Sequence, residues 1–203
     1  MNPQPGADST RDRIVTAATT EFARHGIAGA RIDRIAKAAR TSKERVYAYF
    51  RSKEDLYRFV SAQELAAVAE ATRMDPTDLP GYAGRLHDYF AAHPERHRLM
   101  AWGRLELDPG STPADDDPIR RTVAHKTRQL RRAQEAGHLD PAWDPLDVLV
   151  FVNQIATSWA DQPGLTATTS PEQAQHLAAR RAAIVNAVQR LFPAVPAAPD
   201  GTP

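Results

Sequence analysis

The 203-residue chain contains no cysteine, which excludes a disulfide framework and thiolate chemistry. This composition suits a reducing compartment, and we expect a cytoplasmic protein. No uninterrupted apolar run approaches the roughly 18 residues that a membrane-spanning helix requires. The polar segment 1–9 carries no secretory signal. We therefore expect no interaction with a membrane.

Signals for β-strands are also scarce, because β-branched clusters are rare and no hairpin dipeptide separates alternating apolar runs. Apolar residues instead recur at three- and four-residue spacing, which predicts an all-α fold of about nine helices. Isolated Ser, His and Asp residues are present, but none has the spacing of a nucleophile–base pair, and no phosphate-binding loop is visible. We therefore predict that the chain is not an enzyme and uses no cofactor.

The net charge of +1 conceals an uneven distribution. Segment 31–53 contains eight basic and two acidic residues, whereas the chain beyond residue 55 has more acidic than basic residues. A phosphate-binding surface needs such a basic segment, because neutralising phosphates releases condensed counterions. An ordinary solvated basic face would have the same composition, so charge alone leaves both interpretations open.

Two short predicted helices lie within this basic segment. The first spans about 31–40, and the second begins after Ser42, whose hydroxyl can cap it. Val46 and Phe50 are four residues apart and should face inward. Two short helices joined by a tight turn form a helix-turn-helix, whose second helix enters the major groove of DNA. The residues left outside or at the rim are Lys43, Arg45, Tyr47, Ala48 and Tyr49.

Seven further helices are predicted over about 10–25, 53–73, 81–93, 95–107, 118–136, 146–160 and 172–192. The acidic run 115–117 precedes one of them and should cap it, since anions are favoured at helix N-termini; a metal site is the alternative. His93 and His97 are four apart, which permits either zinc binding or a place in a pocket wall. Because Pro94 interrupts the turn and no cysteine helps, we predict no metal site.

The helix over 146–160 is apolar on nearly every side in its first half, which indicates burial all round. In a short chain, a second copy would have to cover one side. Together with the apolar stripe of the last helix, this predicts a homodimer closed by a four-helix bundle. The predicted interface residues are Val148, Val152, Ile155, Leu177, Ile184, Val188 and Leu191.

Large side chains of the C-terminal part could line a small-molecule pocket, since such pockets are mostly apolar with a few polar groups. Each of them could equally belong to an ordinary core, and the sequence leaves this open. The candidates are Phe90, His97, Met100, Trp102, Phe151 and Trp159.

One pattern of about 47 residues runs without a gap from the first helix into the fourth. It comprises Thr10–Ile14, Ala17–Ala18, Phe22–Ala23, Gly26, Ile32, Ile35–Ala36, Ala39, Thr41–Lys43, Val46–Phe50 and Ser52–Leu56. This pattern resembles the N-terminal domain of the TetR family of transcriptional repressors, whose helix-turn-helix ends in Leu-Tyr-x-Tyr-Phe-x-x-Lys. Residues 57–203 resemble the family only in length and helical pattern.

The resemblance implies a ligand-responsive transcriptional regulator, a repressor that binds a palindromic double-stranded DNA operator as a homodimer and is released by a small-molecule effector. It implies a flexible arm over 1–9, a DNA-binding domain over 10–55, a ligand-binding and dimerisation domain over 56–192, and a disordered tail over 193–203. Ligand binding would move the fourth helix and spread the two recognition helices. The alternatives are a small-molecule binder or enzyme on the same scaffold, and a ligand-free architectural DNA binder.

Carried over by position, the resemblance also implies individual DNA contacts. Phosphate contacts would come from Arg31, Tyr47, Tyr49 and Lys53, and contacts to base edges or nearby backbone from Lys43, Arg45 and Ala48.

The sequence departs from the family pattern at three places. Ala30 and Arg31 replace the usual Thr/Ser pair, so the second helix lacks its expected cap. Arg40 replaces a turn glycine and would be strained if its φ is positive. Glu44 and Arg45 replace small residues, and they can accept from cytosine N4 and donate to guanine, respectively.

Overall fold

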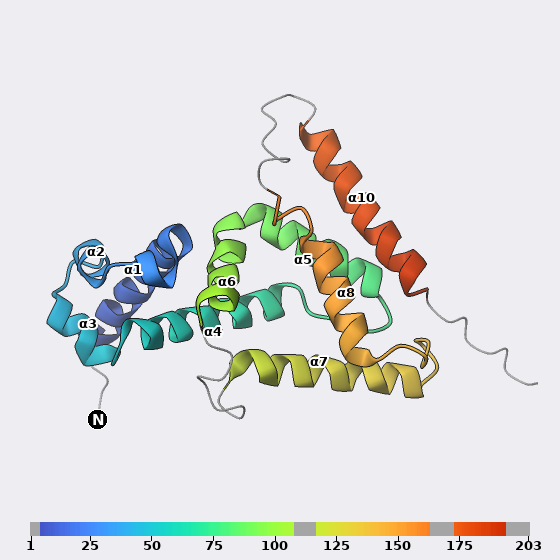
Figure 1. Cartoon of the computed structure of the whole chain (residues 1–203), viewed down its shortest axis with the longest axis horizontal. Helices are drawn as coiled ribbons and strands as arrows, with labels where there is room; N and C mark the ends of the chain where they lie inside the picture. The colour runs from blue at the N-terminus through green and yellow to red at the C-terminus, as the bar shows by residue number, and fades with distance from the viewer. Residues whose placement is uncertain (1–4, 108–116, 163–172, 194–203) are drawn as a thin grey trace, which may run out of the picture. The chain divides into compact units, whose positions relative to one another are not determined.

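The computed structural model describes residues 5–107, 117–162 and 173–193, which contain helices and connecting loops and no β-strand. The all-α prediction is therefore confirmed. Figure 1 labels the helices, whose bounds are α1 Pro5–Gly29, α2 Ile32–Ala38, α3 Lys43–Tyr49, α4 Lys53–Ala71, α5 Leu79–Ala92, α6 Pro94–Glu106, α7 Pro118–Glu135, α8 Pro145–Thr157 and α10 Gln173–Leu191.

The chain forms two compact units, and it crosses between them inside α4, after Ala66. Unit 1 contains α1, α2, α3, the first part of α4, and α6. Unit 2 contains the end of α4 together with α5, α7, α8 and α10. Unit 1 is therefore larger than the domain expected over 10–55, because α6 packs on α1.

Helix α1 begins earlier than the sequence indicates. Residues 5–9 of the predicted arm 1–9 are helical, while residues 1–4 lie outside the described residues; the flexibility of the arm stays a prediction. Gly26 adopts a positive φ of 69°, so the straight part of the helix ends where the glycine predicts a stop. The predicted tail falls outside the described residues after Pro193.

Side-chain caps fix the starts of several helices. The Ser42 hydroxyl accepts from the Arg45 amide at 3.2 Å, as predicted, and the Ser52 hydroxyl accepts from the Asp55 amide at 3.0 Å. At α7 the carboxylate of Asp117 accepts from the Ile119 amide at 2.9 Å. The other two aspartates of the acidic run lie outside the described residues.

The core of unit 1 is shared by all five of its helices. Phe22 of α1 packs edge-on against Tyr57 of α4, with ring centroids 5.3 Å apart. The Tyr57 hydroxyl donates to the Leu99 carbonyl of α6 at 2.6 Å, and burial raises the pKa of Tyr57 to about 12. A Cβ on Gly103 would lie 2.6 Å from the same hydroxyl, so glycine permits this close approach of α6 to α4. Buried Ile35 and Val46 join the same cluster from α2 and α3.

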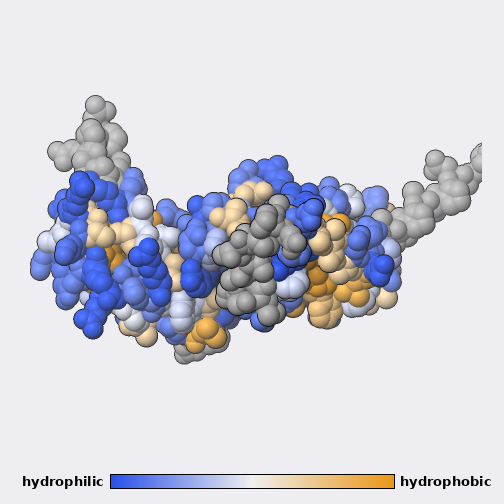
Figure 2. Space-filling model, turned by 90° about the horizontal axis from the view of Figure 1, so that it is seen from above, coloured by the Kyte–Doolittle hydropathy of each residue, from blue (hydrophilic) through white to orange (hydrophobic). Residues whose placement is uncertain are grey.

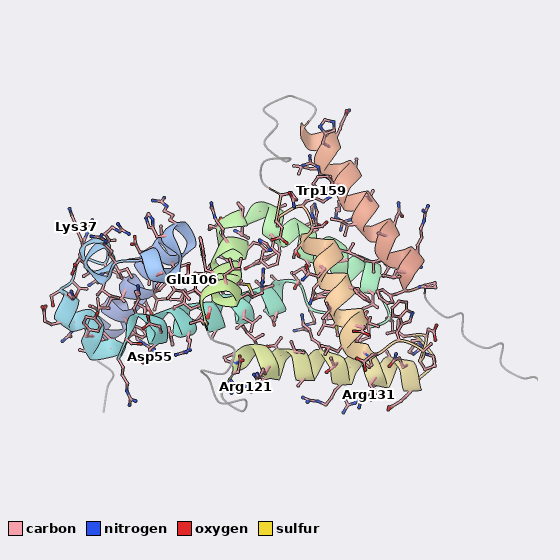
Figure 3. All side chains as sticks on the ribbon, viewed as in Figure 1. Lys37, Asp55, Glu106, Arg121, Arg131 and Trp159 are labelled. Carbon is pink, nitrogen blue, oxygen red and sulfur yellow. The ribbon has the colours of Figure 1, made fainter. Side chains whose placement is uncertain are left out.

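A second contact joins α6 to α1. Glu106 accepts a hydrogen bond from the Ala28 amide at 2.7 Å, and Figure 3 shows its position beside α1. The Trp102 ring lies where a Cβ on Gly26 would meet it at 3.1 Å. The backbone turn at Gly26 is therefore covered by two side chains of α6.

Unit 2 has its own core. Helix α5 packs against α8 and α10, and α7 packs against α8. An exposed ion pair at 2.8 Å between Arg181 and Asp88 joins α10 to α5. The largest fully buried side chains of this unit are Leu79, Tyr82, Leu130 and Val152.

The turn after α2 has the geometry of a left-handed helix cap. Arg40 has a φ of 52°, so the condition for backbone strain at this position is met. It is the one non-glycine residue with positive φ in the described part of the chain. The Thr41 amide donates to the Ala36 carbonyl at 3.0 Å, and the Arg40 amide donates to the Lys37 carbonyl at 3.2 Å. This pair of bonds is a Schellman motif, which favours glycine at the position of Arg40.

Replacing Arg40 with glycine should raise the free energy of unfolding by about 0.5–1 kcal/mol. Left-handed strain costs roughly 1–2 kcal/mol, and the greater freedom of glycine in the unfolded chain offsets part of the gain. Denaturant unfolding at fixed protein concentration measures the change. The matched control is Arg51→Gly, which removes the same charge at a position without positive φ and should lower stability. A less stable Arg40→Gly variant would contradict the assignment of strain.

Candidate DNA interface

Helix α3 is fixed by its inner face and open on its outer face. Val46 and Phe50 are 1% and 6% exposed and belong to the core of unit 1. Tyr49 is partly buried against that core, whereas the Tyr47 ring is 43% exposed. The remaining outward residues, all exposed, are Lys43, Glu44, Arg45 and Ala48. The structure thus brings together the residues expected on the recognition helix, and their contacts to DNA stay a prediction.

The charged groups on this face already have partners. Lys43 lies 3.4 Å from the Asp33 carboxylate of α2, and the Arg45 guanidinium lies 5.7 Å from the centre of the Tyr49 ring. Such exposed pairs contribute little in water, so phosphates can replace them. The backbone amide of Glu44 and the Ser42 hydroxyl lower the pKa of the Glu44 carboxyl, which stays ionised near neutral pH.

Lys53 has a structural contact that the sequence does not reveal. Its ammonium donates to the carbonyls of Ala28 and Ala30 at 3.0 and 3.3 Å, at the C-terminal end of α1. Helix C-termini carry unsatisfied carbonyls and attract cations. An ammonium has three N–H groups, so one donor of Lys53 remains for a DNA phosphate.

The missing cap of α2 is supplied by another helix. No side chain caps α2 at Arg31, as the sequence indicates. Instead, the Glu21 carboxylate of α1 accepts from the Arg31 amide at 2.9 Å and from Arg34 Nε at 2.6 Å. Glu21 is 9% exposed, so its charge is balanced mainly by these donors. The Arg31 side chain itself is exposed.

Sequence reasoning missed the residues that orient α2. Arg13 completes the set, since its Nε donates to the Ala39 carbonyl at the other end of α2 at 3.0 Å. One signal was present: Glu21 lies three residues after Ala18 and seven after Ile14, so it falls on the buried face of α1. A charged residue on such a face requires a partner.

The six predicted pocket residues divide between the two units. His97, Met100 and Trp102 belong to unit 1, and Phe90, Phe151 and Trp159 belong to unit 2. Phe151 is 41% exposed and packs edge-on against Trp143, and its place in a pocket stays a prediction. Trp102 covers the turn at Gly26, and the centre of the Trp159 ring lies 4.5 Å from the guanidinium carbon of Arg180. For Phe90, His97 and Met100 the prediction stays untested.

An open groove of about 570 Å³ lies on the outer side of α1 and α2 in unit 1. Its walls contain charged and small side chains, and it includes none of the predicted pocket residues. The lining residues are Asp12, Arg13, Thr16, Ala17, Thr20, Glu21, Arg24, Arg34 and Ala38. This open groove lacks the large apolar side chains expected in the walls of a small-molecule pocket.

Four of the seven predicted dimer residues point inward. Val148, Val152, Ile184 and Val188 are at most 3% exposed within the single chain, so they have no surface to offer to a second copy, and the prediction is wrong for them. Ile155 is partly buried, whereas Leu177 and Leu191 are exposed. The exposed apolar residues of α8 are instead Leu146, Val150 and Phe151.

The described residues contain neither a metal-binding cluster nor a membrane span. No group of three or more His, Cys, Asp or Glu side chains is arranged to hold a metal ion within residues 5–107, 117–162 and 173–193. In these same ranges, no helix has the length and apolar character needed to cross a bilayer.

Comparison with known families matches both parts of the chain. Residues 14–60 match the family described as bacterial regulatory proteins, tetR family. Residues 78–190 match the family described as tetracyclin repressor-like, C-terminal domain.

Individual relatives agree with this result. The chain is 40% identical over 153 residues to the HTH-type transcriptional repressor SCO4008 of Streptomyces coelicolor, covering 75% of this chain and 79% of that protein. It is 36% identical over 107 residues to the repressor NicS of Pseudomonas putida, covering 49% and 50% of the two chains. The solved structure of SCO4942 from Streptomyces coelicolor has a TM-score of 0.78 and 58% identity, covering 91% of this chain and 98% of that chain.

Replacing Glu21 with glutamine should lower the free energy of unfolding by about 1–2 kcal/mol, because it weakens a charge-assisted bond to Arg34 and the cap of α2. Denaturant unfolding gives the energy, and hydrogen exchange at the Arg31 amide reports the cap itself. Glu54→Gln, at an exposed position on α4, is the control and should cost less. Equal losses for the two variants, with unchanged exchange at Arg31, would refute the role of Glu21.

Proposed function

Because the chain belongs to the TetR family of bacterial regulatory proteins, we propose that it is a ligand-responsive transcriptional repressor that binds a palindromic operator as a homodimer. Its relatives SCO4008 and NicS are named as repressors, which supports repression as the outcome of DNA binding. Such a protein acts where the bacterial chromosome lies, in the cytoplasm.

The observation that carries this proposal is the two-faced character of α3. The inner face is buried in a core built by α1, α2, α4 and α6, so the helix cannot turn or detach without unfolding unit 1. The outer face presents basic, aromatic and base-reading side chains to solvent, and Figure 2 shows hydrophilic surface over this part of the chain. A rigid helix with that outer face suits the major groove.

Residue types suggest how the contacts divide. Arg45 can form a bidentate pair with guanine, and Glu44 can accept from cytosine. Tyr47 and Lys53 would hold phosphates, as would Arg31 at the start of α2. The ion pair between Lys43 and Asp33 leaves the Lys43 ammonium close to the same surface, available to phosphate or to a base edge.

The proposed dimer uses the exposed side of α8 and α10. Val150 and Phe151 of α8 and Leu177 and Leu191 of α10 are 37–43% exposed, although they are apolar. Large apolar side chains exposed on two helices that pack together can form an interface. Figure 2 shows orange, hydrophobic surface on the side of the view where Figure 1 places these two helices. A two-fold dimer would present two copies of α3, which suits a palindromic operator.

The proposed ligand response depends on the separation of the chain into two compact units. Unit 2 has a core separate from that of unit 1, and the chain passes from one to the other within α4 and again between α5 and α6. A small molecule that binds unit 2 could therefore act on unit 1 through two continuous stretches of chain. Phe90 and Trp159 remain candidates for the lining of its site.

Two substitutions should separate base reading from phosphate binding. Arg45→Ala should lower affinity for the preferred operator by about 1–3 kcal/mol and relax the base preference at one position. Lys53→Ala should weaken binding to all sequences alike and reduce the salt slope of log K by about one unit. Fluorescence polarisation with selected and scrambled duplexes at several salt concentrations measures both effects.

The control for these variants is Arg128→Ala, an exposed basic residue of α7 in the other unit, which should leave operator affinity nearly unchanged. Because Lys53 also binds the end of α1, the melting temperature of Lys53→Ala is measured alongside. A uniform loss of affinity for Arg45→Ala would reduce Arg45 to a backbone contact. Unchanged affinity and salt slope for both variants would sink the proposal that α3 binds DNA.

Val150→Glu should weaken self-association at least tenfold, since it places a charge within the proposed apolar interface. Analytical ultracentrifugation over a range of concentrations measures the dissociation constant of the dimer. Ala124→Glu, on the exposed side of α7, is the matched control and should leave the dimer intact. A Val150→Glu dimer as stable as the wild type would place the interface elsewhere.

A further inference from the structure

Helix α7 has two different faces. Arg128 and Arg132 are exposed, and Figure 3 shows Arg121 and Arg131 pointing away from the other helices of unit 2. The residues of the inner face recur at three- and four-residue spacing, as in a helix that packs on one side. That inner stripe contains Val123, Lys126, Leu130 and Ala133, so Lys126 is its one charged member.

Lys126 bonds to a neutral side chain of α5, which in turn bonds to a neutral side chain of α8. Its Nζ donates to the Tyr82 hydroxyl of α5 at 2.8 Å, and that hydroxyl donates to Asn153 Oδ1 of α8 at 3.0 Å. Burial raises the pKa of Tyr82 to about 12, so the phenol stays neutral and supplies no negative charge. The chain of hydrogen bonds uses one of the three N–H groups of the ammonium.

The acidic side chains on α5 and just before it are engaged elsewhere. Asp88 pairs with Arg181 at 2.8 Å, and Asp78 lies 3.4 Å from Arg85. Within the described residues, no carboxylate lies within ion-pair distance of the Lys126 ammonium, whose contacts there are the hydrogen bond to the Tyr82 hydroxyl and a cation–π contact with the Tyr82 ring at 4.8 Å. Burial lowers the pKa of Lys126, as expected for a cation that has lost water without gaining a counter-charge.

An unbalanced, partly buried cation is costly, and most proteins place an apolar residue or an ion pair at such a position. A methionine would fill similar space without that cost. Lys126 is therefore better explained by a ligand than by stability. Leu130 lies one helical turn from Lys126 on α7, and Leu86 lies one turn from Tyr82 on α5; both are buried and apolar, so the ammonium lies at the edge of the apolar core of unit 2.

We propose that Lys126, together with Tyr82 and Asn153, forms the recognition site for a small monoanionic effector: a carboxylate attached to an apolar body. The inference rests on the proposed ligand response and adds the chemical class of the effector. A carboxylate supplies the missing single charge and accepts the two N–H groups that Lys126 has left. A dianionic phosphate would need more than one cation, and a cationic effector would be repelled.

The composition of the chain provides a direct test. It contains four lysines, and the other three, Lys37, Lys43 and Lys53, all belong to unit 1. Full-length protein labelled with ¹³C at lysine Cε therefore gives four signals, three of which are internal controls. The probes are octanoate and benzoate, each matched with its neutral amide. We expect at least one carboxylate to move the Lys126 signal saturably, while the amides leave all four signals in place.

Two variants complete the test. Lys126→Met should reduce affinity for the carboxylate at least tenfold, measured by isothermal titration calorimetry, while Lys37→Met should bind as the wild type does. Equal shifts of all four signals would show non-specific binding and overturn the site. Two other results would also overturn the site. One is that the amides shift the Lys126 signal as much as the carboxylates do, and the other is that no carboxylate shifts it.

Release of operator DNA is measured separately by fluorescence polarisation. If a carboxylate binds at Lys126 and the complex with DNA stays intact at saturation, the site stands and the ligand response fails. If an amide or a cation releases DNA while carboxylates neither bind nor release it, the ligand response stands and the site at Lys126 is wrong.

Discussion

Everything at the DNA-facing end of the chain depends on one shared hydrophobic core. Val46 and Phe50 attach α3 to it, Ile35 attaches α2, and Tyr57 links it to α6 through the Leu99 carbonyl. Because all five helices of unit 1 bury residues in this one cluster, the outer face of α3 has a fixed direction. A recognition surface requires that rigidity, since base contacts depend on side chains held within a fraction of an ångström.

The sequence predicts features that arise from local chemistry. The caps at Ser42 and Ser52, the stop at Gly26 and the helix-turn-helix all follow from residues that lie close together in the chain. It does not predict contacts between distant segments. The cap that Glu21 gives to α2 joins residues ten apart across a turn, and the bond from Lys53 to Ala28 joins residues 25 apart. Such pairings depend on how helices pack, which periodicity alone does not determine.

Four of the seven predicted dimer residues are buried for a related reason. A helix that is apolar on nearly all sides has no hydrophobic face to fix its rotation about its own axis. The apolar sequence of α8 therefore indicates an unusual helix but not which of its residues face outward. Val148 and Val152, which were predicted at the interface, are buried, whereas Leu146 and Val150 are exposed. Packing against α5 and α7 fixes the rotation, and that information lies in the other helices.

The position of Lys53 has a consequence for the thermodynamics of DNA binding. A free lysine side chain loses rotamer freedom worth roughly 1.5–2 kcal/mol when it is immobilised. Lys53 is already held by two carbonyls at the end of α1, so folding has restricted it before any phosphate arrives. In the proposed complex, this pre-organised ammonium would gain its phosphate contact with a smaller entropic loss than a mobile lysine such as Lys37, whose side chain is exposed on α2.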